Sequence, residues 1–259
     1  MKVVILCGGL GTRLREETEF RPKPLVEIGQ RPVLWHIMKL YAHYGYRDFV
    51  LCLGYRGNMI KDYFLNYEAF TNDFTICLGQ TQKAITYHDV HQEQDFSVTL
   101  ADTGPDTMTG GRVRRIARYI EDDTFLLSYG DGVADLDVGR LVAFHRGHGK
   151  VATLTTVRPQ SRYGVLDVDP AGRVRKFAEK PRLDQWANIG YFVLNRRIFD
   201  YLGGDDCVLE QAPLERLAAQ GQLMAYRHEG FFFAMDTYRD YKAINDMWSA
   251  GQRPWVVWE

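Results

Sequence analysis

The chain has 259 residues, which is enough for one large α/β domain or two small ones. Apolar residues make up 46% of it and charged residues 25%, as in an ordinary globular protein. The net charge of −1 gives no general basic field, so binding to nucleic acid or to an anionic membrane is disfavoured, and any phosphate site must be local.

Cysteines and apolar runs bear on the compartment. The four cysteines are scattered, and no two of them have the spacing of metal ligands. Cys7 and Cys52 end apolar runs, so we expect buried thiols rather than disulfides. The first apolar run is too short for a signal peptide, and no run approaches the length that crosses a membrane. We therefore expect a soluble, cytoplasmic protein with no membrane partner.

The chain begins with an apolar run, Val3–Leu6, that is typical of a buried parallel strand. This run breaks into the glycine-rich turn Gly8–Arg13. Bare backbone N–H groups in such a turn can face an anion at the carboxyl end of a sheet. Arg13 and Lys23 add two positive charges at the same place, as phosphate groups require. The pattern indicates a turn that binds a triphosphate.

The next segments alternate between amphipathic helices and buried strands. Apolar stripes predict helices over 32–44 and 58–67, with a buried strand over 48–53 between them. This βαβα order with short connections predicts a parallel, doubly wound sheet. Residues 70–100 break the rhythm, and we expect either an excursion of antiparallel strands or a lobe that packs on a neighbour there. Its short strands are predicted at 74–77, 84–87 and 96–100.

A second glycine-rich turn at 102–112 precedes a predicted helix over 113–120. The buried strand that follows, 124–129, ends in an acidic residue between glycines, Asp131. Open α/β sheets place ligand chemistry at the carboxyl ends of such central strands. Asp236 or Thr237 is expected to cap the last helix. The remaining predicted segments, in chain order, are a helix at 136–148, a strand at 151–157, a hairpin at 163–178, a strand at 189–194, a helix at 210–220, a strand at 222–228 and a helix at 238–249.

Three explanations compete for the first glycine turn. A P-loop requires a lysine directly after its last glycine, and none follows here. A dinucleotide-binding turn requires a third glycine, where this chain has Leu14. A plain structural turn remains open, but it does not explain the nearby Arg13 and Lys23.

The segments Gly8–Leu14 and Lys23–Val26 together resemble the signature of sugar-1-phosphate nucleotidyltransferases. The resemblance covers nearly the whole chain and is closest to the branch that acts on CTP and glucose 1-phosphate. It implies an α/β fold with a Rossmann-like, doubly wound mixed sheet and a smaller antiparallel β excursion, the nucleotide-diphospho-sugar transferase fold. The chain has no internal repeat, low-complexity tract or linker, so we expect a single domain, 1–259, with a nucleotide half at about 1–135 and a sugar-binding half at about 136–259. Further matching stretches are Val26–Gly29, Leu34–Lys39, Thr109–Arg112, Tyr129–Asp135, Phe144–His145, His148–Lys150, Met235–Thr237, Arg239–Asp240 and Pro254–Trp255.

The reaction implied by the resemblance joins a sugar 1-phosphate to CTP and releases pyrophosphate. A phosphate oxygen attacks the α-phosphorus in line, so the protein mainly positions the substrates and neutralises charge. Arg13 would neutralise the leaving pyrophosphate, and Lys23 would bridge the α-phosphate and the sugar phosphate. Asp131 and Asp236 would hold the cofactor, Mg²⁺, which takes hard oxygen ligands.

The resemblance also implies two sets of binding residues. The implied nucleotide-binding residues are Leu6, Gly8, Gly9, Gly11, Thr12, Arg13, Thr103 and Gly111. The implied sugar-phosphate-binding residues are Arg112, Tyr129, Glu179, Lys180 and Asn188. For Arg112 three roles stay open: a phosphate contact in its own subunit, the same contact in a neighbouring subunit, or one more charge on a helix face.

Three segments beside the implied sugar subsite depart from this branch. Phe233-Ala234 stand where the branch has Gln-Pro, Ile189-Gly190 stand where it has paired glycines, and the loop 182–187 differs. The sugar is therefore open between glucose and a modified hexose or heptose, and another nucleoside triphosphate is the alternative to CTP.

The resemblance implies a homo-oligomer such as a hexamer, with residues 70–100 and the C-terminal tail at the contacts. It places the protein in deoxysugar or lipopolysaccharide O-antigen assembly. One rival is a sensor that binds a nucleotide-sugar without turnover, although such a protein has no use for the full set of charges. A nicotinamide-dependent dehydrogenase is the other, and Leu14 disfavours it.

Overall fold

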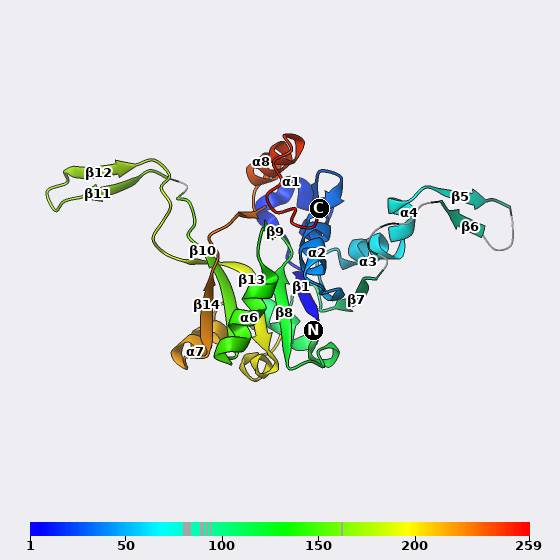
Figure 1. The fold of residues 1–259 in the computed structure, drawn as a ribbon, viewed down its shortest axis with the longest axis horizontal. Coiled ribbons are helices and arrows are strands. Elements are labelled where there is room, and N and C mark those ends of the chain that lie inside the picture. The colour runs from blue at the N-terminus through cyan, green and yellow to red at the C-terminus, as the bar shows by residue number, and fades with distance from the viewer. Residues whose placement is uncertain (80–83, 89–90, 92, 94, 162) are drawn as a thin grey trace.

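The computed structural model describes residues 1–79, 84–88, 91, 93, 95–161 and 163–259. Within this part of the chain, a seven-stranded sheet has the order β14-β10-β13-β8-β1-β4-β7 (Figure 1). β13 runs antiparallel to both of its neighbours, whereas the other neighbouring strands pair in parallel. The predicted doubly wound mixed sheet is therefore confirmed. Its strands are β1 (Val3–Cys7), β4 (Asp48–Leu53), β7 (Ser97–Asp102), β8 (Thr124–Tyr129), β10 (Ala152–Val157), β13 (Ala187–Asn195) and β14 (Leu223–Arg227).

Helices pack on both faces of this sheet because alternate residues of the buried strands point to opposite sides. Val3 and Ile5 enter one apolar cluster, and Val4 enters the other. The first cluster receives side chains from α2 (Val33–His43), α3 (Gly57–Leu65), α6 (Val138–His148) and α8 (Tyr238–Ser249). The second receives them from α5 (Thr109–Arg115) and α7 (Ala212–Ala219).

Shorter elements complete the body. β9 (Gly132–Ala134) pairs with β15 (Phe232–Ala234), which brings the segments after β8 and before α8 together. Thr237 caps α8 in a capping box with Asp240, so of the two predicted cap residues the threonine serves. The other short elements are α1 (Arg15–Thr18), α4 (Tyr67–Thr71), β2 (Glu27–Ile28), β3 (Arg31–Pro32) and the 3-10 turns Thr12–Leu14, Lys23–Leu25, Ala117–Tyr119 and Arg196–Tyr201.

Two antiparallel hairpins project from opposite sides of the body (Figure 1). One consists of β5 (Phe74–Cys77) and β6 (Ala84–Tyr87), and the other of β11 (Val165–Val168) and β12 (Val174–Ala178). Both hairpins were predicted. A strand is present near the third predicted segment, 96–100, but its assignment to the excursion was wrong, because β7 pairs in parallel with β4 at the edge of the main sheet. Val98 and Leu100 pack on the first apolar cluster there, which the short run of sequence did not reveal.

The predicted helix over 113–120 was also wrong at its start, because α5 begins at Thr109 inside the second glycine turn. Close packing explains the two glycines. A Cβ on Gly110 would lie 2.6 Å from Cys207 Sγ, and one on Gly111 would lie 2.9 Å from the carbonyl oxygen of Gly204. The glycines therefore let the helix approach the segment before α7.

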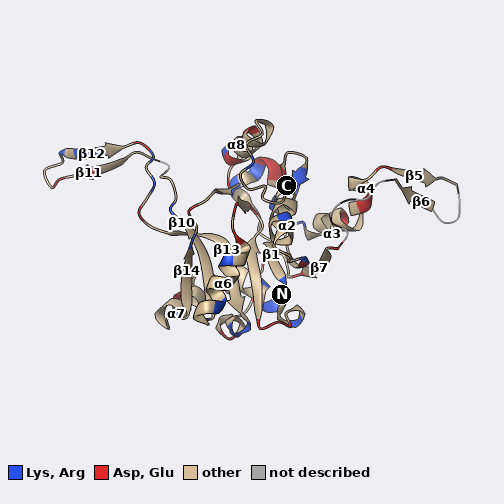
Figure 2. Ribbon diagram, viewed as in Figure 1, with Lys and Arg blue, Asp and Glu red and all other residues tan. Residues whose placement is uncertain are grey.

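Strands from both predicted halves lie in the one main sheet, since β1, β4, β7 and β8 precede residue 136 and the other three follow it. The division into a nucleotide half and a sugar half stays a prediction. Within the described residues, no helix is long and apolar enough to cross a membrane. Lys and Arg are interspersed with Asp and Glu over the body (Figure 2), as the near-zero net charge suggests.

Candidate functional site

A pocket of about 470 Å³ lies at the carboxyl ends of β1 and β8. These strands are parallel neighbours, so the segments that follow them meet at one edge of the sheet. The lining combines backbone of the glycine turn with charged and hydroxyl side chains. Its residues are Leu6, Cys7, Gly9, Gly11, Thr12, Arg13, Lys23, Pro24, Thr109, Tyr129, Gly130, Asp131 and Glu210.

The first glycine turn leads from β1 into a 3-10 turn and keeps its backbone open to this pocket. Gly11 has φ +64°, a left-handed conformation that favours glycine, and a Cβ there would lie 2.6 Å from Cγ2 of Thr18. The Thr18 hydroxyl lies 3.0 Å from the Gly11 carbonyl oxygen and donates a hydrogen bond to it. This contact holds the turn in place.

The four residues predicted to be catalytic come together, and three of them, Arg13, Lys23 and Asp131, line the pocket. Lys23 Nζ lies 2.6 Å from Asp131 Oδ2 and 3.0 Å from Asp236 Oδ1. The Arg13 guanidinium lies on the other side of Asp236, with Nη2 3.0 Å from Oδ1. Lys23 is 9% exposed, whereas Arg13 is largely in solvent. Two cations and two carboxylates, from segments far apart in the chain, thus form one alternating cluster.

The cluster suits Mg²⁺ by its chemistry. Asp131 follows β8 and Asp236 follows β15, and their oxygens approach the same ammonium group. Mg²⁺ is commonly bound by one or two carboxylates together with phosphate oxygens and water. Within the described residues no group of three or more His, Cys, Asp or Glu side chains could hold a metal. The pair therefore fits a metal that a bound phosphate helps to hold, rather than an all-protein cage.

A second pocket, of about 580 Å³, has Asp236 in its wall. Asn188, which was predicted to bind the sugar phosphate, lines this pocket, and its contact with a ligand stays a prediction. The three segments that depart from the branch pattern all contribute to its wall. Its residues are Val157, Arg158, Pro159, Gln160, Arg182, Ala187, Asn188, Ile189, Gly230, Phe232, Phe233, Ala234, Asp236 and Asp240.

Hydrogen bonds around Glu210 connect the two pockets. The hydroxyl of Tyr129 donates to one oxygen of Glu210, and the Thr109 hydroxyl donates to the other at 2.6 Å. Asn188 Nδ2 lies 3.4 Å from the same tyrosine hydroxyl. Burial and the neighbouring Glu210 charge raise the pKa of Tyr129, so its hydroxyl keeps its proton and donates it. Gly190, at φ +80°, leaves room for the Tyr129 ring, 2.2 Å from where a Cβ would be.

The structure separates some predicted binding residues from these pockets. Five residues of the predicted nucleotide-binding set line the first pocket, namely Leu6, Gly9, Gly11, Thr12 and Arg13, and so does Tyr129 of the predicted sugar-phosphate set. Gly8, Thr103, Gly111 and Arg112 are buried and do not line either pocket. Their ligand contacts stay predictions.

Glu179 and Lys180 lie at the base of the β11–β12 hairpin and line neither pocket. They are exposed and form an ion pair with each other at 3.6 Å. The Gln160 side chain, which lines the second pocket, donates to the Lys180 carbonyl at 3.1 Å. The predicted sugar contacts of both residues stay predictions.

Sequence reasoning missed Glu210. It precedes α7 in a segment without a recognisable motif, and no local pattern indicates that it faces Tyr129 across the sheet. Thr109 belongs to a matching stretch but was assigned no role, because the second glycine turn was not expected to be helical there.

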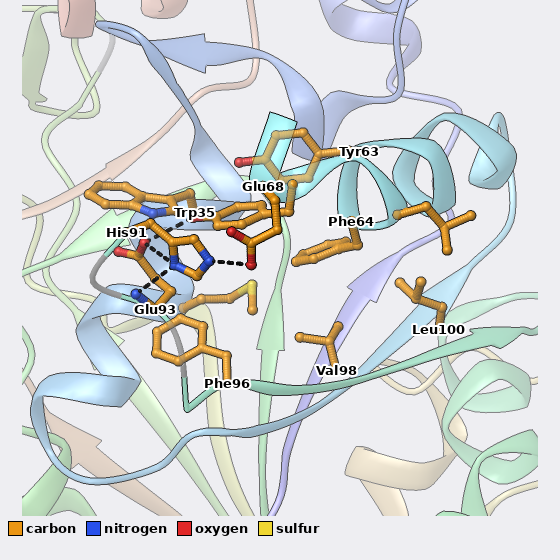
Figure 3. Close-up of a pocket in the computed structure, with 12 residues that line it drawn as sticks. Trp35, Tyr63, Phe64, Glu68, His91, Glu93, Phe96, Val98 and Leu100 are labelled. Carbon is orange, nitrogen blue, oxygen red and sulfur yellow. Dashed lines mark hydrogen bonds and ion pairs between the residues drawn. The ribbon is translucent and has the colours of Figure 1, made fainter. Parts of the chain in front are cut away.

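A third pocket, of about 540 Å³, lies away from this edge, between α2, α3 and β7. Aromatic side chains, among them Trp35, Tyr63 and Phe96, surround it (Figure 3). Its acidic groups have partners within the protein: the imidazole of His91 lies 2.8 Å from Glu68 and 3.6 Å from Glu93.

Comparisons with known proteins agree with the geometry. The family model described as nucleotidyl transferase matches residues 2–252. A glucose-1-phosphate cytidylyltransferase of Salmonella typhi is 49% identical, and a probable one of Bacillus subtilis is 44% identical, each over the full length of both chains. The crystal structure of HddC from Yersinia pseudotuberculosis has a TM-score of 0.70 at 24% identity, over 95% of this chain and 99% of that one. This last similarity concerns the fold alone.

Proposed function

The chain belongs to the nucleotidyl transferase family, and we propose that it transfers the cytidylyl group of CTP to glucose 1-phosphate, giving CDP-glucose and pyrophosphate. Two full-length relatives, named glucose-1-phosphate cytidylyltransferase and probable glucose-1-phosphate cytidylyltransferase, are 49% and 44% identical to this chain and support the choice of both substrates. The observation that carries the proposal is the position of Lys23 between two carboxylates, beside a glycine turn that opens onto a pocket.

In this proposal the triphosphate lies along the glycine turn and the sugar phosphate enters from the second pocket. Lys23 then lies where both phosphates approach, and its ammonium offsets negative charge that crowds in the transition state. Arg13 extends from the turn into solvent, which suits a group that neutralises a leaving pyrophosphate. The attacking atom is an oxygen of the sugar phosphate, already ionised at neutral pH, so the protein's contribution is alignment and charge.

Mg²⁺ is the proposed cofactor, held by Asp131 and Asp236 together with phosphate oxygens. When bound, it supplies charge neutralisation and a fixed template for the phosphates. The two aspartates approach Lys23 from segments that β9 and β15 hold together. The nucleotide and the metal would take over contacts that the four side chains now make with one another.

A modified hexose or heptose 1-phosphate is the alternative acceptor. All three departing segments line the second pocket, where the side chain of Phe233 and the backbone near Ile189 would face a sugar. The reaction class is unaffected by this choice, because the glycine turn, Arg13, Lys23 and Asp131 line the first pocket and not the second.

The test measures pyrophosphate release by the purified full chain from each of the four ribonucleoside triphosphates, paired with several sugar 1-phosphates and Mg²⁺. We expect the highest kcat/KM with CTP and glucose 1-phosphate. Release with CTP and a different sugar would correct the acceptor only. No release with any pair would contradict the enzyme and favour a sensor.

We further propose a homo-oligomer such as a hexamer, assembled through the projecting hairpins. Two-stranded hairpins are marginal by themselves in water, yet β11–β12 exposes Leu166 at 50% and Phe177 at 60%. A second copy of the chain would cover these side chains. Light scattering should give a multiple of the 29.9 kDa chain mass, and Leu166→Ser with Phe177→Ser should reduce it. An unchanged mass would contradict contact through this hairpin, and Phe144→Ser on α6 serves as the control.

The product class fits deoxysugar or lipopolysaccharide O-antigen assembly, because a nucleotide-activated hexose is the usual starting material for both. Loss of surface polysaccharide in a deletion strain, restored by the wild-type chain and not by a Lys23→Met variant, is the expected result.

A further inference from the structure

Arg112 lies beneath the nucleotide pocket and joins three strand ends. It projects from α5 and is only 4% exposed. The acceptors belong to the ends of β1, β4 and β7, or to the segments that follow them. Its guanidinium donates to the carbonyl oxygens of Leu53 (3.0 Å), Gly8 (3.1 Å), Gly104 (2.7 Å) and Pro105 (3.1 Å) and to the hydroxyl of Thr103 (2.8 Å).

Two glycines make room for this guanidinium. A Cβ on Gly8 would lie 2.1 Å from Nη1 of Arg112, and a Cβ on Gly54 would lie 2.4 Å from the same atom. Neither glycine has a positive φ, so backbone conformation does not explain them. Space for the arginine does. Gly8 is therefore part of the sequence signature and also leaves the space in which Arg112 contacts the glycine turn.

Burying this cation has a cost, because all five acceptors are neutral oxygens. Burial lowers the pKa of Arg112 from its usual value. Arginine suits such a place better than lysine, because its planar fork donates in several fixed directions and keeps its charge. A lysine could reach at most one or two of these loops.

We propose that Arg112 is a positioning residue, which fixes the strand ends around the glycine turn and so sets the geometry of the nucleotide pocket. It acts through Gly8, Leu53 and the 103–105 segment, rather than through a contact with a substrate phosphate. The inference rests on the proposed function, since it assumes that a nucleotide binds in this pocket. Misplacing reacting groups by about 1 Å can cost about 10²-fold in rate, which sets the expected scale.

The first experiment compares Arg112→Lys and Arg112→Met with the wild-type chain. Dissociation constants for CMP and CTP are measured by calorimetry, and kcat/KM by pyrophosphate release. We expect both variants to weaken CMP and CTP by the same factor and to lower kcat/KM by about 10²-fold. Arg118→Met, an exposed arginine beyond the end of α5, should behave as wild type.

Each other outcome overturns the inference in a distinct way. A larger loss for CTP than for CMP would assign Arg112 to the phosphates themselves. An Arg112→Lys variant close to wild type would show that charge alone is needed. Unchanged binding in Arg112→Met would remove any role. If the wild-type chain binds neither nucleotide, the proposed function fails instead.

A second variant tests the same idea without removing the arginine. In Gly54→Ala the new methyl group would displace the guanidinium, so the loss of CTP affinity should match that of Arg112→Met. In the double variant the flexible methionine yields to the methyl group, and no further loss is expected. Additive losses would overturn the inference. Melting curves of the three proteins check that each is folded.

Discussion

Replacing Lys23 with methionine tests whether this residue contributes to catalysis or only to the stability of the fold. Lys23 Nζ lies 2.6 Å from Asp131 Oδ2 and 3.0 Å from Asp236 Oδ1, and methionine keeps most of the side-chain volume without the charge. Removal of one preorganised group that stabilises transition-state charge costs about 10²–10³ in kcat, or about 3–4 kcal/mol. We expect a loss of kcat in that range with CTP and glucose 1-phosphate.

The same substitution should cost much less in folding free energy. Arg13 still lies 3.0 Å from Asp236, so Asp131 is the carboxylate that loses its close partner. Its side chain is 28% exposed and can gain water contacts, so we expect a loss of no more than about 2 kcal/mol. Urea unfolding monitored by circular dichroism measures this change in the free energy of unfolding.

The assay is pyrophosphate release under saturating substrates, with Lys242→Met as a matched control. Lys242 is an exposed lysine on α8, and its loss should leave kcat unchanged. A Lys23→Met enzyme within about threefold of wild type would refute the catalytic role of Lys23, since the expected effect is at least about 10²-fold. The catalytic role would also be refuted if the loss of activity were fully explained by the fraction of the variant that is unfolded.

The other predictions concern the metal, pH and the link between pockets. Asp131→Asn or Asp236→Asn should raise the Mg²⁺ concentration for half-maximal activity at least about tenfold, because a neutral amide replaces a charged oxygen ligand; a magnesium titration of activity measures this. Burial lowers the pKa of His36 and of His145 from 6.5 to about 4, so only the unfolded chain takes up these protons between those pH values. Stability should therefore be complete above pH 6.5 and fall as the pH drops toward 4, as urea unfolding across that range will show. Glu210→Gln should change KM for one or both substrates and leave the melting temperature nearly unchanged, since Glu210 accepts hydrogen bonds from the hydroxyl groups of Thr109 and Tyr129 beside the pockets.

Controls for these three predictions are direct. Unchanged magnesium dependence in both aspartate variants would remove the metal site. For His36 the hydrogen bonds fix the tautomer of the neutral ring. Nε2 carries the proton and donates to the Ile28 carbonyl at 3.1 Å, and Nδ1 accepts a hydrogen bond from Trp255 at 3.4 Å. Protonation of Nδ1 would break the second bond, so His36→Gln should flatten part of the pH dependence. Equal KM values in Glu210→Gln and wild type would show that Glu210 only supports the wall.

Local patterns in the sequence determined much of the fold. Apolar runs and apolar stripes located β4, β8 and α8 at the residues where the structure has them, because burial on a sheet and on a helix leaves a short-range period. The element order predicted a doubly wound sheet with parallel strands, and only the resemblance to the family implied the mixed sheet in which β13 runs antiparallel to its neighbours. The resemblance to the family, rather than the element order, implied that Arg13, Lys23, Asp131 and Asp236 share one site, and the structure brings the four side chains together.

Contacts between distant segments were decided only by the tertiary structure. The residues next to Arg112 in the sequence do not indicate that its guanidinium is buried against the segments at the ends of β1, β4 and β7. They also do not indicate that Gly54 leaves space for this guanidinium. Glu210 meets Tyr129 because α7 and β8 pack on one sheet, and Glu179 lies outside both pockets because its hairpin projects from the body. Side-chain partners of this kind depend on packing across the whole domain, which one stretch of sequence does not encode by itself.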